Sequence, residues 1–427
     1  MENEILRWQG EGIRNALKSR RVVVLTGARQ TGKTTLLEQI VDKDSLFVSL
    51  DDKSLLTTAR EDPREFIKHP AGTMFIDEVQ KAPDLIPEIK MAVDRNRRPG
   101  QYCLTGSANI QTLPIITDSM AGRNRRIRLR PMTMGEILHR EPKFLEHAFA
   151  MDFPRKITGF DKAQIFDFAF RGGYPEAVHL KNQKDRKEWH DDYLNDLINR
   201  DLKDIMNIRR QSELKELVMI LAGWSGKFMD MAKIGAGMAL AKQTLETYIN
   251  ALESLYLFDR VNPWVRTDYE RVGKSAKFYV NDTGFMTSIL GWKKDGITRD
   301  SDRSGKLMET FVFQELAAQI DLDRDYSLYQ YRDYKQHEVD FLIERNDGSM
   351  VGIEVKASHS VSKEDFAPQI WFRENIFKRG ASGGRVSKNA SLKNSASYKA
   401  LVLYSGEDTL SFGPGLLAVP TAALWIK

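Results

Sequence analysis

The chain has 427 residues, of which 41% are hydrophobic and 29% are charged, and its net charge is +5. This length exceeds what one hydrophobic core supports, so we expect several domains, and the composition excludes a disordered or fibrous chain. The small positive charge is compatible with a nucleic-acid partner but does not require one. The single cysteine, Cys103, excludes internal disulfides and cysteine-rich zinc sites, and its apolar neighbours predict that it is buried.

The start of the chain lacks the basic and apolar segments of a secretory leader. No stretch approaches the run of about 18 apolar residues that a membrane-spanning helix needs. We therefore expect a cytoplasmic protein without a membrane partner.

A phosphate-binding loop is predicted at residues 27–35, called the phosphate loop below. Residues 22–26 read as a strand and residues 36–40 as a helix, and the pattern between them is G-x-x-x-x-G-K-T. Its glycines let backbone N–H groups turn toward phosphate oxygens, and the helix N-terminus adds partial positive charge. We expect ATP to contact the whole loop, which comprises Gly27, Ala28, Arg29, Gln30, Thr31, Gly32, Lys33, Thr34 and Thr35.

Two side chains of the phosphate loop have more specific predicted roles. The Lys33 ammonium would reach the β- and γ-phosphates, and the Thr34 hydroxyl would take a Mg²⁺ position. The structural alternative is an ordinary glycine-containing turn followed by a surface lysine.

Further strands are predicted at residues 46–50, 73–76, 101–104 and 126–129, with helices at 4–19 and 84–94. This alternation of strands and helices predicts a mostly parallel sheet that is covered on both faces. Asp77 and Glu78 directly follow the strand at 73–76. We expect Asp77 to hold Mg²⁺ and Glu78 to orient or deprotonate the attacking water, although acidic residues also end strands for solubility alone.

Polar residues also follow the next strand, at the same predicted edge of the sheet. Ser107, with Asn109 as the second choice, is the predicted contact to the γ-phosphate. Turn chemistry alone is the alternative explanation for both residues.

The densest basic cluster of the chain follows these residues and comprises Arg123, Arg125, Arg126, Arg128 and Arg130. One interpretation is a solvated strand face. The sharper hypothesis is that Arg123 contacts the nucleotide of a neighbouring subunit as an arginine finger, which implies a homo-oligomer.

Four segments resemble the ATPase core of a large prokaryotic group of AAA-type ATPases: GARQTGKTTL, TMFIDEVQK, YCLTGSAN and SMAGRNRRIRLRPMTMGEI. The resemblance runs from about residue 5 to 426, apart from residues 378–397, and it implies a C-terminal PD-(D/E)XK nuclease-like domain. In related signalling ATPases a Gly-x-Pro element lies over the nucleotide. By this resemblance Gly173 and Pro175 would line the nucleotide, whereas their structural alternative is a turn that opens a helix.

Helical periodicity continues through the middle of the chain, at residues 161–170 and 193–206. Helices at 213–222, 229–236 and 243–256, followed by strands at 257–261 and 277–280, predict a winged helix. A DNA-binding winged helix would present Lys242, Gln243, Thr244 and Thr247 to the major groove. Because Glu246 and Glu253 lie on the same helix, packing or contact with a protein partner is an equal alternative.

The C-terminal part carries a second group of candidate residues. A helix is predicted at 303–319, a hairpin combines strands at 337–343 and 351–356, and residues 398–404 and 423–426 read as strands. Glu354 and Lys356 point to one face, where Asp340 of the partner strand can meet them. Two carboxylates and a lysine suit Mg²⁺ binding and activation of water for phosphodiester cleavage, and an ion-paired strand surface is the alternative.

This hairpin, E-V-D-F-L-I…I-E-V-K, resembles the PD-(D/E)XK arrangement. The resemblance implies that Glu309 is the acid on the preceding helix, so that Glu309, Asp340 and Glu354 hold the metal while Asp340, Glu354 and Lys356 are catalytic.

The predicted architecture is therefore a multidomain α/β protein. We expect a P-loop AAA-type core at residues 1–135, a helical lid at 136–208, a winged helix at 209–282 and a PD-(D/E)XK-like domain at 283–427, with a flexible loop at 378–397. The predicted function is an ATP-binding and ATP-hydrolysing switch coupled to the C-terminal effector. The alternatives are an ATP-gated, metal-dependent DNA nuclease and a non-catalytic regulator that binds DNA or protein.

Overall fold

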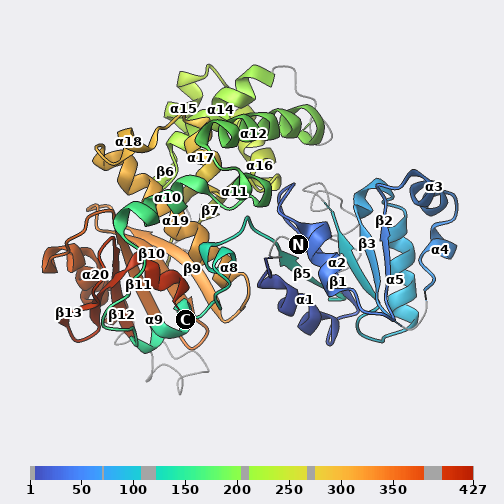
Figure 1. Ribbon diagram of the computed structural model, residues 1–427, viewed down its shortest axis with the longest axis horizontal. Coiled ribbons are helices and arrows are strands. Elements are labelled where there is room, and N and C mark those ends of the chain that lie inside the picture. The colour runs from blue at the N-terminus through green and yellow to red at the C-terminus, as the bar shows by residue number, and fades with distance from the viewer. Residues whose placement is uncertain are drawn as a thin grey trace. The chain divides into compact units, whose positions relative to one another are not determined.

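The computed structural model describes residues 5–69, 72–106, 122–202, 211–266, 275–378 and 397–426. Ser107, Asn109 and nearly all of the predicted flexible loop lie outside the described residues. The chain forms two compact units, each assembled from three segments. Figure 1 labels the helices and strands that are described below. The first unit contains Met1–Met132, Tyr174–Glu216 and Gly235–Phe258; the second contains Thr133–Gly173, Leu217–Ile234 and Asp259–Lys427.

The first unit contains a five-stranded parallel sheet with the order β2-β3-β4-β1-β5. The prediction of a parallel sheet is confirmed, and each strand lies within two residues of its predicted position. The strands are β1 (Val22–Thr26), β2 (Leu46–Ser49), β3 (Met74–Asp77), β4 (Tyr102–Thr105) and β5 (Asn124–Arg128).

Helices cover both faces of this sheet because its central strands are apolar on both sides. On β1, Val22 and Val24 belong to the core cluster beneath α3 (Lys53–Glu61) and α5 (Leu85–Arg95). Val23 and Leu25 belong instead to the cluster beneath α1 (Gln9–Leu17) and α2 (Lys33–Ile40). This division follows from the alternation of side chains along a strand.

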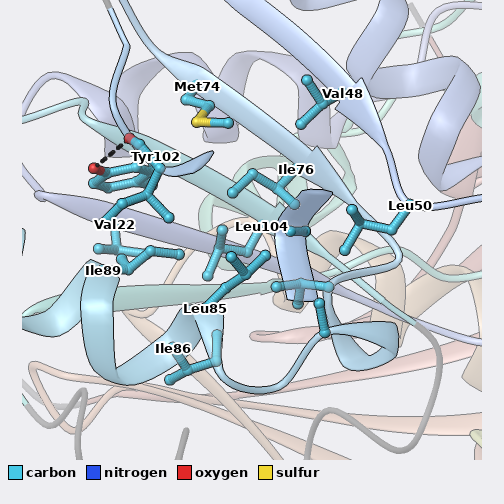
Figure 2. Close-up of a cluster of buried hydrophobic side chains, with 14 of the residues drawn as sticks. Val22, Val48, Leu50, Met74, Ile76, Leu85, Ile86, Ile89, Tyr102 and Leu104 are labelled. Atoms are coloured by element: carbon cyan, nitrogen blue, oxygen red, sulfur yellow. Dashed lines mark hydrogen bonds between the residues drawn. The ribbon is translucent and has the colours of Figure 1, made fainter. Parts of the chain in front are cut away.

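Figure 2 shows the α5 side of the sheet, where Leu85, Ile86 and Ile89 pack against strand residues such as Ile76 and Leu104. The Tyr102 hydroxyl donates to the Ile67 carbonyl at 3.1 Å, which satisfies its polar end inside this core. Cys103 is buried on the opposite face, as predicted.

Other helices in the described part of the first unit are α4 (Pro63–Phe66), α11 (Pro175–His179), α12 (Gln183–Asp196) and α16 (Lys242–Ser254), with the single turns η1 (Val79–Lys81) and η2 (Leu197–Asp201). The helix predicted to begin at residue 193 begins ten residues earlier, so that prediction was wrong at its start. The Asn182 side chain accepts a hydrogen bond from the Asp185 N–H and caps α12. The first turns of α12 are charged and carry no apolar stripe, so periodicity did not reveal them.

The second unit contains a mixed six-stranded sheet with the order β13-β14-β12-β11-β10-β9. Strands β9, β10 and β11 are antiparallel, whereas β11, β12 and β14 run parallel to one another. The strands are β9 (Tyr326–Arg332), β10 (Glu338–Arg345), β11 (Met350–Lys356), β12 (Tyr398–Tyr404), β13 (Leu410–Gly413) and β14 (Leu416–Pro420).

The strand predicted at residues 423–426 was wrong, because this segment belongs to the 3₁₀ turns η7 (Thr421–Trp425). Its Leu424 carbonyl accepts from Gln319 Nε2 at 3.0 Å, and the Trp425 side chain packs on Phe311. Residues 423–425 are therefore apolar because they are buried against a helix, and not because they form a strand.

That helix is α19 (Ser301–Ile320), which matches the predicted helix to within two residues at each end. From Leu307 onward nearly every side chain is buried, as expected for a helix surrounded by protein. It contacts β9 and β11. Phe372 of α20 (Ala367–Phe372) and Phe366, directly before that helix, belong to a core cluster on the same sheet.

Other elements in the described part of the second unit include α8 (Met134–Ile137), α9 (Phe144–Ala150), α10 (Lys162–Arg171), α17 (Thr283–Ile289), α18 (Lys294–Ile297), η4 (Lys363–Phe366) and η5 (Arg373–Phe377). The segment predicted as a winged helix contains α14 (Gln211–Gly223), β6 (Lys227–Phe228), α15 (Met231–Gly237), α16, β7 (Phe258–Val261) and β8 (Lys277–Val280). Its strands form a sheet in the order β6-β8-β7. Within the described ranges, no helix has both the length and the apolar character needed to cross a bilayer.

One buried acid on α19 makes a testable contribution to stability. Glu315 is 0% exposed, and its Oε1 accepts a hydrogen bond from the Met134 N–H at the start of α8, at 2.7 Å. Its Oε2 has no hydrogen-bond partner among the described residues. Burial raises the pKa of Glu315 from 4.5 to about 8, so the folded protein holds this carboxyl in its protonated form at neutral pH.

We predict that Glu315→Gln stabilises the protein increasingly as the pH rises. The stabilising protonated carboxyl is present below about pH 4.5 and is lost progressively up to about pH 8, whereas glutamine does not titrate. The difference in unfolding free energy between variant and wild type should grow by up to about 5 kcal/mol over this range. Urea unfolding at several pH values measures it, with the exposed Glu364→Gln as the control, and a difference independent of pH would contradict the assignment.

Candidate functional site

The phosphate loop adopts its shape because two glycines sit where other residues do not fit. A Cβ on Gly27 would lie 2.2 Å from the Leu129 carbonyl oxygen, so only glycine permits this close approach. Gly32, at φ +88°, occupies the left-handed region directly before α2 begins at Lys33. The strand, loop and helix therefore follow in the predicted order, and the loop leads into the N-terminus of a helix.

The Lys33 side chain lies back over the loop that precedes it. Its Nζ donates to the carbonyl oxygens of Gly27 at 3.1 Å and Ala28 at 2.8 Å. Burial lowers the pKa of this ammonium to about 8, and the nearby Glu78 and Asp77 carboxylates oppose that shift.

Asp77 is a buried carboxylate held by hydroxyl groups from neighbouring elements. Thr34 Oγ1 donates to Asp77 Oδ2 at 3.0 Å, Ser49 Oγ donates to the same oxygen at 3.3 Å, and Thr105 Oγ1 donates to Oδ1 at 3.0 Å. Sequence patterns identified Asp77 and Thr34 but not Ser49, which is the residue opposite Asp77 in the β2–β3 register. The adjacent hydroxyl and carboxylate oxygens of Thr34 and Asp77 are hard ligands, and they fit Mg²⁺.

Glu78 leaves the strand in an uncommon backbone conformation. Its φ is 57°, which places a residue that is not glycine in the left-handed region at a cost of about 1 kcal/mol or more. Its carboxylate accepts from Gln80 Nε2 and is the strongest charged influence on Lys33. The acid predicted to act on the attacking water therefore lies close to the phosphate loop.

Arg7 is a support for the phosphate loop that the sequence patterns did not identify. Its guanidinium is buried and donates to the Thr31 carbonyl at 2.7 Å and to the Arg130 carbonyl at 2.6 Å. It thereby ties the loop to the segment after β5. No motif distinguishes Arg7 from the many other basic residues, so only the structure shows its role.

Residues after α10 also reach the phosphate loop within the first unit. A Cβ on Gly32 would lie 3.9 Å from Pro175 Cγ, so Pro175 lies beside the loop. The Tyr193 hydroxyl donates to the Arg29 carbonyl at 3.3 Å, and Arg29 Nε lies 3.6 Å from Asp201 Oδ2. Gly173, the other residue of the predicted element, belongs to the second unit, where its N–H donates to Asp282 Oδ2 at 2.6 Å.

Arg123 directly precedes β5, and its neighbour Asn124 pairs with Val22 at the start of β1. The phosphate loop follows the carboxyl end of β1, whereas Arg123 lies beside the amino end of that strand. Its guanidinium binds Asp94 through two hydrogen bonds, of 2.5 and 3.0 Å. This position separates Arg123 from the loop of its own chain, and its role toward a neighbouring subunit stays a prediction.

The second group of predicted residues comes together in the second unit. Asp340 lies on β10, Glu354 and Lys356 lie on β11, and Glu309 lies on α19. Asp340 Oδ2 accepts from the Val355 N–H at 3.1 Å, and Lys356 Nζ donates to Glu354 Oε1 at 3.1 Å.

A lysine outside the predicted set lies at the centre of this group. Lys277 of β8 is 1% exposed, and its Nζ lies 3.0 Å from Glu309 Oε1, 3.2 Å from Asp340 Oδ1 and 2.5 Å from Glu338 Oε1. Tyr279, two residues further along β8, donates its hydroxyl to Glu309 Oε1 at 2.6 Å. We call Glu309, Glu338, Asp340 and Glu354 the carboxylate cluster.

The ionisation of the carboxylate cluster reflects its burial. Burial raises the pKa of Glu309 to about 7, Asp340 adds to this rise, and Lys277 and Tyr279 oppose it. Burial and Asp340 also raise the pKa of Glu354 well above its usual value. Burial alone would lower the pKa of Lys277, but the negative groups around it raise that pKa.

The nuclease-like resemblance implies a divalent metal ion among these carboxylates. In the part of the chain that the structure describes, however, no three His, Cys, Asp or Glu side chains are arranged to hold one. The Lys277 ammonium instead lies between the oxygens of Glu309 and Asp340. As arranged, the carboxylate cluster does not fit a divalent cation.

A parallel sheet with a phosphate loop after β1 and an acidic pair at the end of β3 defines a P-loop ATPase core. Residues 19–138 match the family described as "AAA domain". Residues 162–296 and 304–424 match two further families, each described as a domain of unknown function (DUF8612 and DUF4143). The chain thus contains an AAA-type P-loop ATPase domain followed by these two regions.

Two similar curated proteins cover most of the chain. An uncharacterized protein of Mycobacterium tuberculosis is 26% identical over 351 residues, which is 82% of this chain and 73% of that protein. An uncharacterized protein of Methanocaldococcus jannaschii is 25% identical over 342 residues, covering 76% of this chain and 72% of that protein.

Among solved structures, AMPPCP-bound DnaA from Aquifex aeolicus matches with a TM-score of 0.30 and 14% identity, over 59% of this chain and 90% of that chain. The Thermotoga maritima RuvB Holliday junction branch migration motor matches with a TM-score of 0.27 and 16% identity, over 59% and 88% of the two chains.

We predict that Arg7→Ala weakens ATP binding about tenfold, because the phosphate loop loses its charge-assisted hydrogen bond at Thr31 and, with the bond to Arg130, its tie to the segment after β5. Fluorescence titration with a labelled ATP analogue measures the affinity. The matched control is Arg14→Ala, an exposed arginine on α1. Equal affinity in both variants would show that Arg7 does not support the loop.

Proposed function

We propose that this protein is an ATP-hydrolysing molecular switch whose nucleotide state controls the C-terminal part of the chain. One observation carries the proposal: Lys33 and the hydroxyl-held Asp77 lie together at one edge of a parallel sheet, with Glu78 next to them. This is the set of groups that phosphoryl transfer from ATP to water requires.

Each residue has a separate task in the proposed reaction. The backbone N–H groups of the phosphate loop and the Lys33 ammonium bind the β- and γ-phosphates. Thr34 and Asp77 would hold Mg²⁺, which supplies positive charge against the phosphate oxygens when it is bound. Glu78 orients the attacking water and accepts its proton, and ADP and inorganic phosphate are the products.

The contacts around the phosphate loop support a lid that responds to nucleotide. Pro175 lies beside the loop, Tyr193 donates to it, and Asp201 pairs with its Arg29. These residues belong to α11, α12 and η2, and the chain continues from η2 toward α14. A change in the shape of the phosphate loop when it binds phosphate would therefore move α11, α12 and η2 before any later part of the chain.

For the winged-helix segment we propose contact with a protein partner in preference to base readout. The exposed residues of α16 include Lys242, Gln243 and Thr247. However, Lys242 Nζ lies 3.9 Å from Glu246 Oε1 on the same face of the helix. This surface is nearly neutral, whereas DNA binding depends on unpaired positive charge.

We predict that Glu78→Gln retains ATP binding but lowers the turnover number at least about 100-fold, since glutamine cannot accept the proton of water. Phosphate release, measured with and without DNA, tests this, with the α5 variant Glu88→Gln as the control. No turnover in the wild type under any of these conditions would contradict the proposal. Stimulation by DNA would favour a DNA partner over a protein partner.

An ATP-gated, metal-dependent DNA nuclease is the second candidate. The observation that favours it is the convergence of Asp340, Glu354, Lys356 and Glu309, which resembles a PD-(D/E)XK site. The position of Lys277 between the oxygens of Glu309 and Asp340 argues against it.

Because the Lys277 ammonium already lies between Glu309 and Asp340, we predict that the wild type leaves supercoiled plasmid intact in Mg²⁺ or Mn²⁺, with or without ATP. Gel electrophoresis of the plasmid measures nicking. If the wild type nicks and both Asp340→Ala and Lys356→Ala do not, the nuclease is the correct function.

A further inference from the structure

We propose that Lys277 is the resident cation of the carboxylate cluster, where it takes the place of a divalent metal ion and keeps the cluster free of metal. The inference rests on the nuclease-like arrangement of the carboxylates in the proposed function, but it does not depend on ATP hydrolysis. It assigns the lysine a role that belongs to a metal ion in the enzymes that this arrangement resembles.

Lys277 Nζ donates hydrogen bonds to Glu309 Oε1 and Asp340 Oδ1 and forms an ion pair with Glu338 Oε1. A lysine ammonium has three N–H donors, and three carboxylate oxygens lie within 2.5 to 3.2 Å of Lys277 Nζ. These oxygens come from α19 and from two positions of β10 on one face of the strand, Glu338 and Asp340. The ammonium thus contacts two of the three acids that the resemblance assigns to a metal ion, Glu309 and Asp340, together with Glu338.

Lys277 is also held inside the protein, unlike a surface lysine that can swing away. Phe228 of β6 is its partner in the β6–β8 register, and the Phe228 ring lies 5.5 Å from Nζ. Gly226, at φ +74°, approaches the Glu309 carboxylate so closely that a Cβ there would lie 3.1 Å from Oε2. Withdrawal of the lysine therefore requires β6 and β8 to move.

The charges of the site exclude simultaneous occupation by Lys277 and a divalent ion. The carboxylate cluster has four acids, and three cations lie against them: Lys277, Lys356 beside Glu354, and Arg332 with Nε 3.8 Å from Glu338 Oε2. These cations leave at most one negative charge without a counter-charge. A metal ion in contact with the same oxygens would lie a few ångströms from the ammonium, and such repulsion is strong away from water.

The cation and the acids come from different regions of the chain. Lys277 lies in the region that matches the first family of unknown function, at residues 162–296, and the carboxylate cluster lies in the region that matches the second, at 304–424. The earlier region therefore supplies the positive charge that occupies the carboxylate cluster of the later region. Movement of β8 is the event that would expose the carboxylates.

Mn²⁺ binding to the full-length chain without nucleotide tests the proposal. Electron paramagnetic resonance measures free Mn²⁺, and each protein is compared with the same protein carrying Asp340→Asn, so that any Mn²⁺ bound near Thr34 and Asp77 cancels. We expect no Asp340-dependent Mn²⁺ in the wild type, and one Asp340-dependent ion in Lys277→Met and Lys277→Gln. The control Lys227→Met changes an exposed lysine of the adjacent β6 and should resemble the wild type.

Each outcome decides the question. An Asp340-dependent Mn²⁺ site in the wild type overturns the proposal, and so does the absence of such a site in folded Lys277→Met and Lys277→Gln. If both variants unfold, recovery of their circular dichroism and thermal unfolding midpoint on addition of Mn²⁺ supports the proposal, and failure to recover overturns it. ATP turnover of the same wild-type preparation tests the proposed function separately.

Discussion

A buried charge costs several kcal/mol unless partners around it replace water, and both sites of this protein are built on that constraint. Asp77 is surrounded by three hydroxyls, and Lys33 is bound by two carbonyl oxygens of its own loop. Lys277 has carboxylates on three sides. For Asp77 and Lys277 the compensating groups come from more than one element, so the buried charge fixes how those elements meet. Functional geometry and stability are therefore properties of the same contacts.

The ATPase core was predictable because its signals are local. The phosphate loop and the acidic pair each occupy a few consecutive residues, and the apolar pattern of the strands places them at one edge of a parallel sheet. Lys277 was not predictable in this way, because its partners Glu309 and Asp340 are 32 and 63 residues away and nothing in its own strand indicates acids. Arg7 was also missed. Its acceptors are backbone carbonyls, which every residue has, so no sequence pattern indicates the contact.

Errors in the predicted elements also have physical causes. The apolar residues of η7 resemble a strand, but they are buried against α19 by tertiary packing. The early turns of α12 are polar, and only the cap at Asn182 marks the start of the helix. The two compact units each combine three separate segments, and patterns that are read along the chain yield continuous stretches only.

The position of Lys277 has a consequence for dividing the protein into parts. A fragment that begins at the start of the last family region, residue 304, contains the four acids of the carboxylate cluster but not the lysine that contacts three of them. The natural cut in this part of the chain therefore lies before β8, and further back still if β6 is to cover the lysine. The boundary of a sequence family and the boundary of an electrostatically complete folding unit are different places in this protein.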